Sequence, residues 1–322
     1  MRILVVGGAG YIGSAVVPAL AERGYELAVV DLLWFGNHLP GDIPVVCKDV
    51  FELAETDLHG YDQVIFLAGL SNDPMAEFSP SKNFISNAAA PAYLAYTAKR
   101  AGVRRFIYAG SCSVYGYTVN ELYGEKSPAV SKHPYGISKL QGEQAALQLS
   151  DETFSVICFR QGTVSGYSPR MRLDLIVNTM FHTAIQNGEI VVNNPSIWRP
   201  ILSIEDAVSA YTRAVEATPE ITGIFNIASG NYMVGETADI VKDVLDRELH
   251  TRIKLTIKHL QDYRNYKVSC EKAINVLSFK PRHTVSSIVE DLVKNRGRFT
   301  DFDNPVYYNI RVFESLDRTE TR

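Results

Sequence analysis

Paired cysteines, long apolar runs and an excess of one charge are all missing from this chain of 322 residues. Its four cysteines are far apart and form no paired spacing, which argues against a disulfide framework and against a metal site. No apolar run approaches the roughly 18 residues that a membrane-spanning helix needs. The first residues lead directly into a short apolar segment and a glycine turn, unlike a signal peptide. We therefore expect a cytoplasmic protein without a bound metal or a membrane partner.

The charge balance is mild, with 32 basic and 36 acidic residues and a formal net charge of -4. It gives no reason to expect nucleic acid as a partner. A ligand that carries phosphate would have to be bound by a few local arginines.

What the chain does contain is an alternation of short apolar segments with helical segments. Continuous runs of Val, Ile, Leu and Phe are typical of parallel strands that are buried on both faces. We predict such strands at 2–6, 26–30, 43–47, 63–67, 104–109, 154–159 and 224–228. We predict helices between them at 12–23, 81–101, 134–149 and 205–217. This repetition predicts an α/β fold with a Rossmann-like, doubly wound parallel sheet of about seven strands.

A glycine-rich turn, GGAGYIG, joins the first predicted strand to the first predicted helix. Glycines in this position let backbone N–H groups and a helix N-terminus approach a pyrophosphate. Asp31 ends the second predicted strand, where a carboxylate accepts the ribose hydroxyls and repels a 2′-phosphate. Asp49, after the third strand, is placed to bond the adenine amino group. The turn therefore predicts an NAD site that includes Gly7, Gly10, Tyr11, Ile12 and Gly13.

The later part of the chain follows a different pattern, with helices predicted at 172–187, 235–248, 270–277 and 284–296 and a strand near 252–257. We predict an NAD-binding domain from residues 1–162, to which 201–228 return. Residues 163–200 and 229–322 are expected to form a smaller C-terminal α/β domain that binds substrate. The polar segment 300–322 has no pattern that assigns its structure.

Tyr135 and Lys139 are four residues apart at the start of a predicted helix, so they lie on one face. Free tyrosine has a pKa near 10, and a base at neutral pH needs a pKa about three units lower, which corresponds to roughly 4 kcal/mol. A neighbouring ammonium and a positively charged nicotinamide would provide this stabilisation. Ser111, just past the fifth predicted strand, could then orient the substrate oxygen.

In their order these motifs resemble those of the extended short-chain dehydrogenase/reductase family of nucleotide-sugar enzymes. The matching segments are GGAGYIG, Asp31, Lys48-Asp49-Val50, Leu67-Ala68-Gly69, SCSVYG, YGISK and Trp198-Arg199-Pro200. The resemblance implies that Ser111, Tyr135 and Lys139 are catalytic. It also implies that Val50, Leu67, Ala68 and Gly69 line the cofactor site, and that Asn87 belongs to a relay that positions the lysine. A homodimer formed by the helices at 81–101 and 134–149 is implied as well.

The same resemblance implies a nucleotide-diphosphate sugar as the partner. Arg199 lies in the family's arginine-then-strand motif and Arg264 at its second phosphate-binding arginine, and bidentate arginine suits a phosphate. Asn178 could donate to the same diphosphate, and Ser113 belongs to the expected substrate site. Arg170 and Arg172 have two interpretations, as substrate ligands or as solvated surface side chains.

Three reactions use this apparatus: epimerisation, reduction of a keto sugar and 4,6-dehydration. Dehydratases of the family carry an Asp-Glu pair directly after the catalytic hydroxyl, where this chain has Cys112 and Ser113. Ketoreductases more often use NADPH, which Asp31 disfavours. We therefore expect an NAD-dependent nucleotide-sugar epimerase, with a ketoreductase as the main alternative. Cys112, His133 and His182 are further candidates for proton transfer, and each has an ordinary packing interpretation.

Two interpretations from other classes stay open at this point. A cofactor-sensing regulator on the same fold would not need the tyrosine and lysine that are present here. An oxidoreductase of a lipid or steroid alcohol would not need the arginines.

Overall fold

Seven parallel strands form the central sheet of the computed structural model, which describes residues 1–258 and 264–320 apart from the side chains of residues 119, 319 and 320. Their order is β11-β7-β5-β4-β1-β2-β3. They are β1 (Arg2–Val6), β2 (Glu26–Asp31), β3 (Val45–Cys47), β4 (Gln63–Phe66), β5 (Arg105–Ala109), β7 (Ser155–Gln161) and β11 (Gly223–Ile227). The chain runs from β1 to one edge and then returns through β4 to the other. This doubly wound topology and its seven strands confirm the predicted fold.

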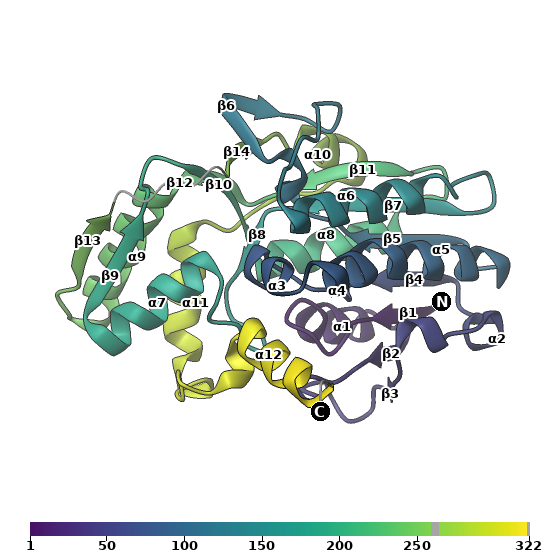
Figure 1. Ribbon diagram of the computed structural model, residues 1–322, viewed down its shortest axis with the longest axis horizontal. Coiled ribbons are helices and arrows are strands. Elements are labelled where there is room, and N and C mark those ends of the chain that lie inside the picture. Colours follow the sequence, from purple (N-terminus) through teal and green to yellow (C-terminus); the bar gives the residue numbers. More distant parts are fainter. Residues whose placement is uncertain (259–263, 321–322) are drawn as a thin grey trace.

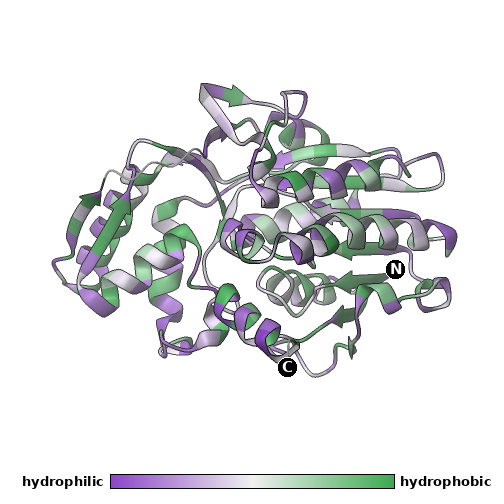
Figure 2. Cartoon of the chain, in the orientation of Figure 1, coloured by the Kyte–Doolittle hydropathy of each residue, from purple (hydrophilic) through white to green (hydrophobic). Residues whose placement is uncertain are grey.

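Helices cover both faces of this sheet, as the apolar strands require (Figure 1). Every residue of β4 and β5 is buried. One core cluster joins the sheet to α5 and α6, and another joins the opposite face to α1 and α8. Figure 2 shows the hydrophobic strands between helices whose outer faces are more hydrophilic. The helices are α1 (Gly13–Ala21), α4 (Pro80–Phe84), α5 (Ala90–Arg100), α6 (Pro134–Leu147) and α8 (Ile204–Glu216).

Three smaller sheets lie outside the central one. Their strand orders are β12-β10-β8, β13-β9 and β14-β6. The strands are β6 (Tyr117–Tyr123), β8 (Thr163–Ser165), β9 (Glu189–Asn193), β10 (Trp198–Ser203), β12 (Gly230–Met233), β13 (Lys254–Lys258) and β14 (Asn265–Val268). Helices α7 (Ile176–Asn187), α9 (Val234–Leu249), α10 (Glu271–Leu277) and α11 (Val285–Asn295) match those predicted after residue 162. The division into two domains stays a prediction, although α8 and β11 do return to the central sheet.

Short elements complete the chain, and several of them contribute to the cavity described below. They are η1 (Val50–Glu52), α2 (Glu55–Leu58), α3 (Asp73–Phe78), the π-helical turn η2 (Ile85–Ala89), η3 (Cys112–Tyr115), η4 (Arg296–Arg298), η5 (Pro305–Tyr307) and α12 (Asn309–Glu320). Helix α12 falls in the segment that the sequence pattern left unassigned. It lies beside α3 and the loop after β2 (Figure 1), where Phe313 packs 5.9 Å from Trp34 and 5.8 Å from Phe78 between ring centroids.

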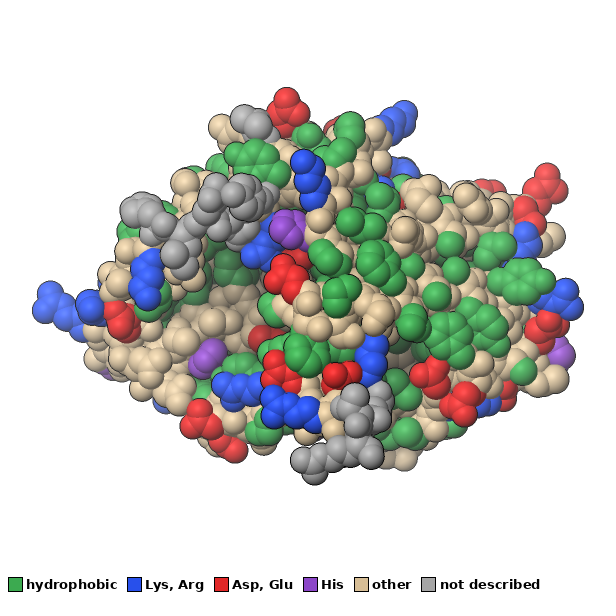
Figure 3. All heavy atoms as spheres, in the orientation of Figure 1, with side chains coloured by type: hydrophobic (Ala, Val, Ile, Leu, Met, Phe, Trp, Pro, Cys, Tyr) green, Lys and Arg blue, Asp and Glu red, His purple; other side chains and the backbone are tan. Residues whose placement is uncertain are grey.

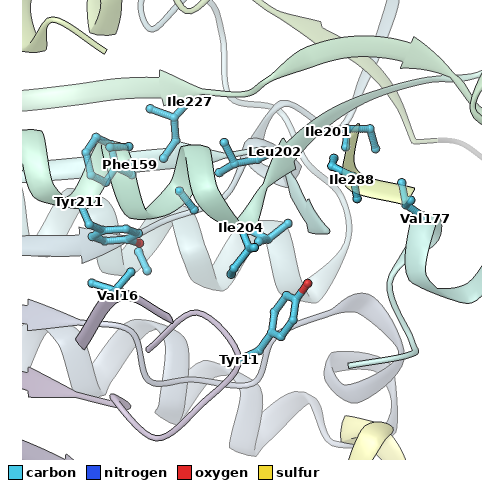
Figure 4. Close-up of a cluster of buried hydrophobic side chains, with 14 of the residues drawn as sticks. Tyr11, Val16, Phe159, Val177, Ile201, Leu202, Ile204, Tyr211, Ile227 and Ile288 are labelled. Carbon is cyan, nitrogen blue, oxygen red and sulfur yellow. The ribbon is translucent and has the colours of Figure 1, made fainter. Parts of the chain in front are cut away.

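A buried cluster ties the glycine-rich turn to a second lobe, which consists of residues 163–200 together with α9 and α11. Figure 4 shows Ile204 at its centre, with Tyr11 on one side and Leu202 on the other. The Tyr11 hydroxyl donates a hydrogen bond of 2.7 Å to the Gly166 carbonyl. The turn and the segment after β7 are therefore held together as two walls of one cavity.

Exposed apolar side chains gather over α5 and its neighbours (Figure 3). They include Phe51, Ile85 and Tyr96, and the last two are 52% exposed. This face coincides with the helices expected to pair in a homodimer, and that dimer stays a prediction. Within residues 1–258 and 264–320, no helix combines the length and apolar character needed to span a membrane.

Candidate active site

A cavity of about 790 Å³ gathers most of the predicted site residues between the central sheet and the second lobe. The space-filling view shows the surface hollowed there, with charged side chains at the rim (Figure 3). The predicted residues that line it are Gly7, Gly10, Tyr11, Ile12, Gly13, Asp31, Asp49, Val50, Leu67, Ala68, Gly69, Ser111, Ser113, Tyr135, Arg199 and Arg264. Lys139, Asn87 and Asn178 belong to the layer behind this lining.

The glycine-rich turn presents bare backbone to one end of the cavity. Gly7 has φ +81, and a β-carbon there would lie 2.4 Å from the backbone nitrogen of Ala68. Glycine is therefore required for β1 to end so close to the strand beside it. Helix α1 begins at Gly13 directly after the turn, and a helix N-terminus with free N–H groups favours an anion. These features fit the pyrophosphate of a dinucleotide.

Asp31 lies at the rim of the same end. Its carboxylate accepts hydrogen bonds from the backbone N–H groups of Ala9 (3.0 Å) and Leu33 (2.8 Å). Burial raises the pKa of Asp31, and these two bonds oppose the rise. Asp49 has a structural task as well, because its carboxylate caps η1 by accepting from the Phe51 N–H at 2.8 Å. Its proposed contact with adenine stays a prediction.

Ser111 and Tyr135 meet at the middle of the cavity. Ser111 caps η3, and its Oγ accepts a 3.1 Å hydrogen bond from the Ser113 N–H. Tyr135 lies in the first turn of α6, directly after Pro134 at a position that favours helix initiation. Burial raises the pKa of Tyr135, and its side-chain hydrogen bond with Ser111 opposes this rise. The arrangement places two hydroxyls where one substrate hydroxyl could contact both.

Lys139 lies one helical turn beyond the tyrosine, as the spacing predicted. Its Nζ donates a 3.0 Å hydrogen bond to the Ala109 carbonyl. Burial lowers the pKa of Lys139 to about 7. Burial also raises the pKa of Tyr135. The lowering of this pKa by the lysine together with an oxidised nicotinamide stays a prediction.

Asn87 lies in the π-helical turn η2, an irregularity often found at functional sites. Its amide nitrogen donates to the Leu70 carbonyl and to Asn83, both at 2.8 Å. Its buried Oδ1 accepts no hydrogen bond from any residue that the structure describes. A β-carbon at Gly69 (φ +135) would lie 2.3 Å from this oxygen and 3.5 Å from Lys139 Nζ. The unsatisfied oxygen and the lysine thus flank one point, which fits the predicted relay.

Two predicted substrate residues, Arg199 and Arg264, lie at the other end of the cavity. The Nη1 atom of Arg199 donates hydrogen bonds to the carbonyls of Trp198 (2.9 Å) and Arg264. Arg264 forms a 2.6 Å ion pair with Asp73, the first acidic residue of α3. Positive charge is therefore held at the end opposite to the glycine-rich turn.

Asn178 has a different environment from the one expected of a phosphate ligand. Its side chain is fully buried. The Oδ1 accepts from the Gly166 N–H at 3.0 Å, and the nitrogen donates to the Arg172 carbonyl at 2.8 Å and to the Tyr11 hydroxyl at 3.1 Å. Asn178 thus supports the wall, and a contact with a diphosphate stays a prediction.

Arg170 and Arg172 are buried and line the cavity, so their interpretation as solvated surface side chains is wrong. Arg172 forms a two-bond ion pair with Asp174, at 2.8 and 3.1 Å. Burial alone would raise the pKa of Asp174, but the arginine lowers it. Asn309, from α12, lines the same wall. The two arginines were candidates from the sequence because both lie in the segment Ser-Pro-Arg-Met-Arg. No sequence pattern in the polar tail identified Asn309 as a site residue.

The remaining candidates for proton transfer do not line the cavity. Cys112 is buried, its Sγ donates to the Arg160 carbonyl at 3.1 Å, and burial raises its pKa far above the ordinary value. His182 contacts the Asn178 carbonyl through Nδ1 at 3.2 Å. His133 precedes α6 as its N-cap. In the described part of the chain, no group of three or more His, Cys, Asp or Glu side chains could hold a metal.

Residues 3–228 match the model of a family described as "NAD dependent epimerase/dehydratase family". A UDP-glucose 4-epimerase from Azospirillum brasilense is 34% identical over 149 residues, which cover 44% of this chain and 43% of that protein. A probable UDP-arabinose 4-epimerase 3 from Arabidopsis thaliana is 25% identical, covering 71% of this chain and 64% of that protein. A UDP-glucose 4-epimerase from Corynebacterium glutamicum is 24% identical, covering 90% and 94%.

Solved structures show the same fold. MoeE5 in complex with UDP-glucuronic acid and NAD superposes with a TM-score of 0.82 and 23% identity, covering 92% of this chain and 99% of that one. DesIV, a dTDP-glucose 4,6-dehydratase from Streptomyces venezuelae, gives a TM-score of 0.81 at 20% identity, covering 95% and 100%.

Proposed function

Because this chain belongs to the NAD-dependent epimerase/dehydratase family, we propose that it is an epimerase of a nucleotide-diphosphate sugar. The enzyme would oxidise one sugar hydroxyl to a ketone and then return the hydride to the opposite face of the sugar. The observation that carries this proposal is the Ser111–Tyr135 pair at the middle of a cavity with the glycine-rich turn at one end and Arg199 at the other. The epimerases of UDP-sugars among the relatives support it.

Different residues of the cavity would bind the cofactor, orient the substrate and transfer the proton. NAD, when bound, accepts the hydride and gives it back. The turn from Gly7 to Gly13 would hold its pyrophosphate and Asp31 its adenosine ribose, while Lys139 and Asn87 would position the nicotinamide ribose. Ser111 would orient the sugar hydroxyl by a hydrogen bond. Tyr135 would remove the hydroxyl proton during oxidation and restore it during reduction.

The carboxylates of the cavity favour epimerisation over dehydration. A dehydratase needs a carboxylic acid that can give a proton to the leaving hydroxyl. Asp73 and Asp174 are each ion-paired with an arginine, at 2.6 and 2.8 Å. Arg172 lowers the pKa of Asp174, which makes this carboxylate a poor proton donor. The position after Ser111 is the buried Cys112, whose thiol bonds to a backbone carbonyl. A ketoreductase remains the second candidate, since it needs no additional acid.

The proposal is tested with purified protein and no added cofactor. Acid denaturation followed by chromatography identifies the dinucleotide that is released. Incubation with individual UDP-sugars, followed by NMR, then reveals any interconversion. We expect bound NAD and formation of the epimer without external cofactor. A demand for one reduced cofactor per product would instead identify a ketoreductase.

The carboxylate of Asp31 is expected to set the preference for NAD. We expect Asp31→Asn to raise the affinity for NADP relative to NAD by about tenfold, because the substitution keeps the size and removes a charge that repels a 2′-phosphate. Calorimetric titration of both cofactors measures the ratio. Asp31→Glu, which keeps the charge, serves as the control. An unchanged ratio in Asp31→Asn would show that the backbone alone selects the cofactor.

Arg199 is expected to bind the substrate diphosphate. We expect Arg199→Leu to weaken UDP binding by about tenfold or more, because a charge-assisted hydrogen bond is lost. The NAD content should stay unchanged, since the glycine-rich turn lies at the opposite end of the cavity. Arg199→Lys separates charge from the bidentate geometry of arginine. Equal UDP affinity in Arg199→Leu and wild type would refute this role.

A further inference from the structure

Arg170 is a buried arginine that forms no ion pair with a carboxylate of the residues that the structure describes. Only 2% of its surface is exposed, yet it lines the cavity. Its Nη2 donates to the side-chain oxygen of Asn309, and its guanidinium lies 3.7 Å from the ring centroid of Phe35. Its Nε has no hydrogen-bond partner among the residues that the structure describes. Arg160 and Arg172, which are also buried, each form an ion pair with a carboxylate.

An uncompensated buried charge is costly, and proteins seldom keep one without a partner. Burial, and after it the charge of neighbouring Arg172, lower the pKa of Arg170 to about 9. The side chain therefore still carries its charge at neutral pH. A guanidinium that is buried, charged and open to a cavity is suited to an anion with several oxygens.

The position of Arg170 identifies which end of the cavity this anion occupies. The Arg170 backbone N–H donates to Ser14 Oγ at 3.2 Å, and Ser14 lies in the first turn of α1. Ser168 Oγ lies 2.8 Å from the same Ser14 oxygen. The charge of Asp31 also acts on Arg170. Arg170 is thus fixed beside the glycine-rich turn, while Arg199 and Arg264 occupy the other end.

We propose that Arg170 binds the diphosphate of the dinucleotide cofactor from the lobe opposite the glycine-rich turn, and that Asn309 of α12 positions its guanidinium. This inference rests on the proposed function only in taking NAD as the resident cofactor. The turn offers backbone N–H groups to the diphosphate from one side, and the Arg170 guanidinium offers its N–H groups from the other. The cofactor is then held by both lobes of the molecule.

Helix α12 is built into this arrangement through Asn309. The Asn309 amide nitrogen donates to Ser71 Oγ at 2.8 Å, and its backbone N–H donates to Asp174 at 3.2 Å. Further along the helix, Phe313 packs against Trp34 in the loop after β2, and Asp317 pairs with Lys82 at 2.8 Å. The C-terminal helix therefore connects the arginine to the loop that follows Asp31.

The test compares Arg170→Met with wild type, and its readout is the cofactor and not turnover. The NAD content of the purified proteins is determined after denaturation, and the affinities for NAD and UDP are measured by titration of stripped protein. We expect Arg170→Met to weaken NAD binding by about tenfold or more and to leave the UDP affinity unchanged. Arg298→Met is the matched control, because Arg298 lies over the Tyr167 ring but is exposed and outside the cavity lining.

A second variant covers the case in which Arg170→Met does not fold. Asn309→Asp keeps the size of the side chain and gives Arg170 a carboxylate of its own, which would compete with the diphosphate. We expect it to weaken NAD binding by about tenfold without lowering the melting temperature of the cofactor-free protein. Unchanged NAD binding in Asn309→Asp would overturn the positioning role of Asn309.

The outcomes separate this inference from the proposed function. Equal NAD affinity in Arg170→Met and wild type would overturn the role of Arg170 while leaving the NAD enzyme intact. Loss of UDP affinity with normal NAD affinity would show that Arg170 binds the diphosphate of the sugar nucleotide. Wild-type protein that binds no NAD at all would instead contradict the proposed function itself.

Discussion

Replacement of Tyr135 by phenylalanine is expected to lower kcat by about 10²- to 10⁴-fold, the range typical for the loss of a general acid–base group. Phenylalanine keeps the ring that is buried at the start of α6 and removes only the hydroxyl that bonds to Ser111. The folded structure and the NAD site should therefore be retained. Turnover of the nucleotide sugar, NAD content and melting temperature are measured on the same preparation.

A matched control for this variant is present in the same cavity. Tyr266 also lines it, and its hydroxyl lies 3.3 Å from Ser113 Oγ. Tyr266→Phe removes a hydroxyl of the same kind at a position without a role in proton transfer, so we expect less than about a tenfold change. Equal losses in both variants would mean that the cavity needs tyrosine hydroxyls for binding and not for proton transfer.

Replacement of Lys139 by methionine is expected to lower kcat by about a hundredfold or more, because the group that would position the nicotinamide ribose is lost. The same substitution should change the pH dependence of stability. The pKa of this lysine is about 7 in the folded protein, against an ordinary value of 10.5. Between these values the unfolded chain binds more protons than the folded one, so wild-type stability should rise with pH.

Wild type and Lys139→Met are expected to differ in how their stability changes with pH. Below pH 7 the buried lysine is charged, and its burial lowers the free energy of unfolding of the wild type by the full amount. Methionine has no charge to bury, so the variant is not destabilised in this way. The stability of Lys139→Met relative to wild type should therefore be highest at pH 7 and below, and should fall steadily toward pH 10. Urea unfolding of both proteins at several pH values measures this difference. A difference that does not change with pH would show that the lysine keeps its ordinary pKa in the fold.

The elements of this fold were predictable because their signals are local. The strands of the central sheet are buried on both faces, so each is a continuous apolar run in the sequence. The glycine-rich turn and the carboxylate at the end of β2 were also evident, since a tight turn restricts which residues it can contain. Ser111 and Tyr135 could be placed together because both follow recognisable strand and helix boundaries.

The environments of other site residues depend on segments that are distant in the chain. The Asn178 side chain is hydrogen-bonded to Gly166, Tyr11 and the backbone of Arg172. No local sequence pattern predicts these contacts. The raised pKa of Tyr135 results from tertiary burial, which the Tyr-x-x-x-Lys spacing does not report. The contact of Arg170 with Asn309 joins residues 139 positions apart. Polar residues in a tail without periodicity give no sign of such a partner.

The central claim is that Tyr135 moves a proton while resident NAD takes up and returns a hydride. It is tested most directly by adding a nucleotide sugar to purified enzyme without external cofactor and recording the near-ultraviolet absorbance of reduced nicotinamide. Wild-type protein should show a transient absorbance and form the epimer, and Tyr135→Phe should show neither at a comparable rate. Epimer formation at the wild-type rate by Tyr135→Phe would contradict the account.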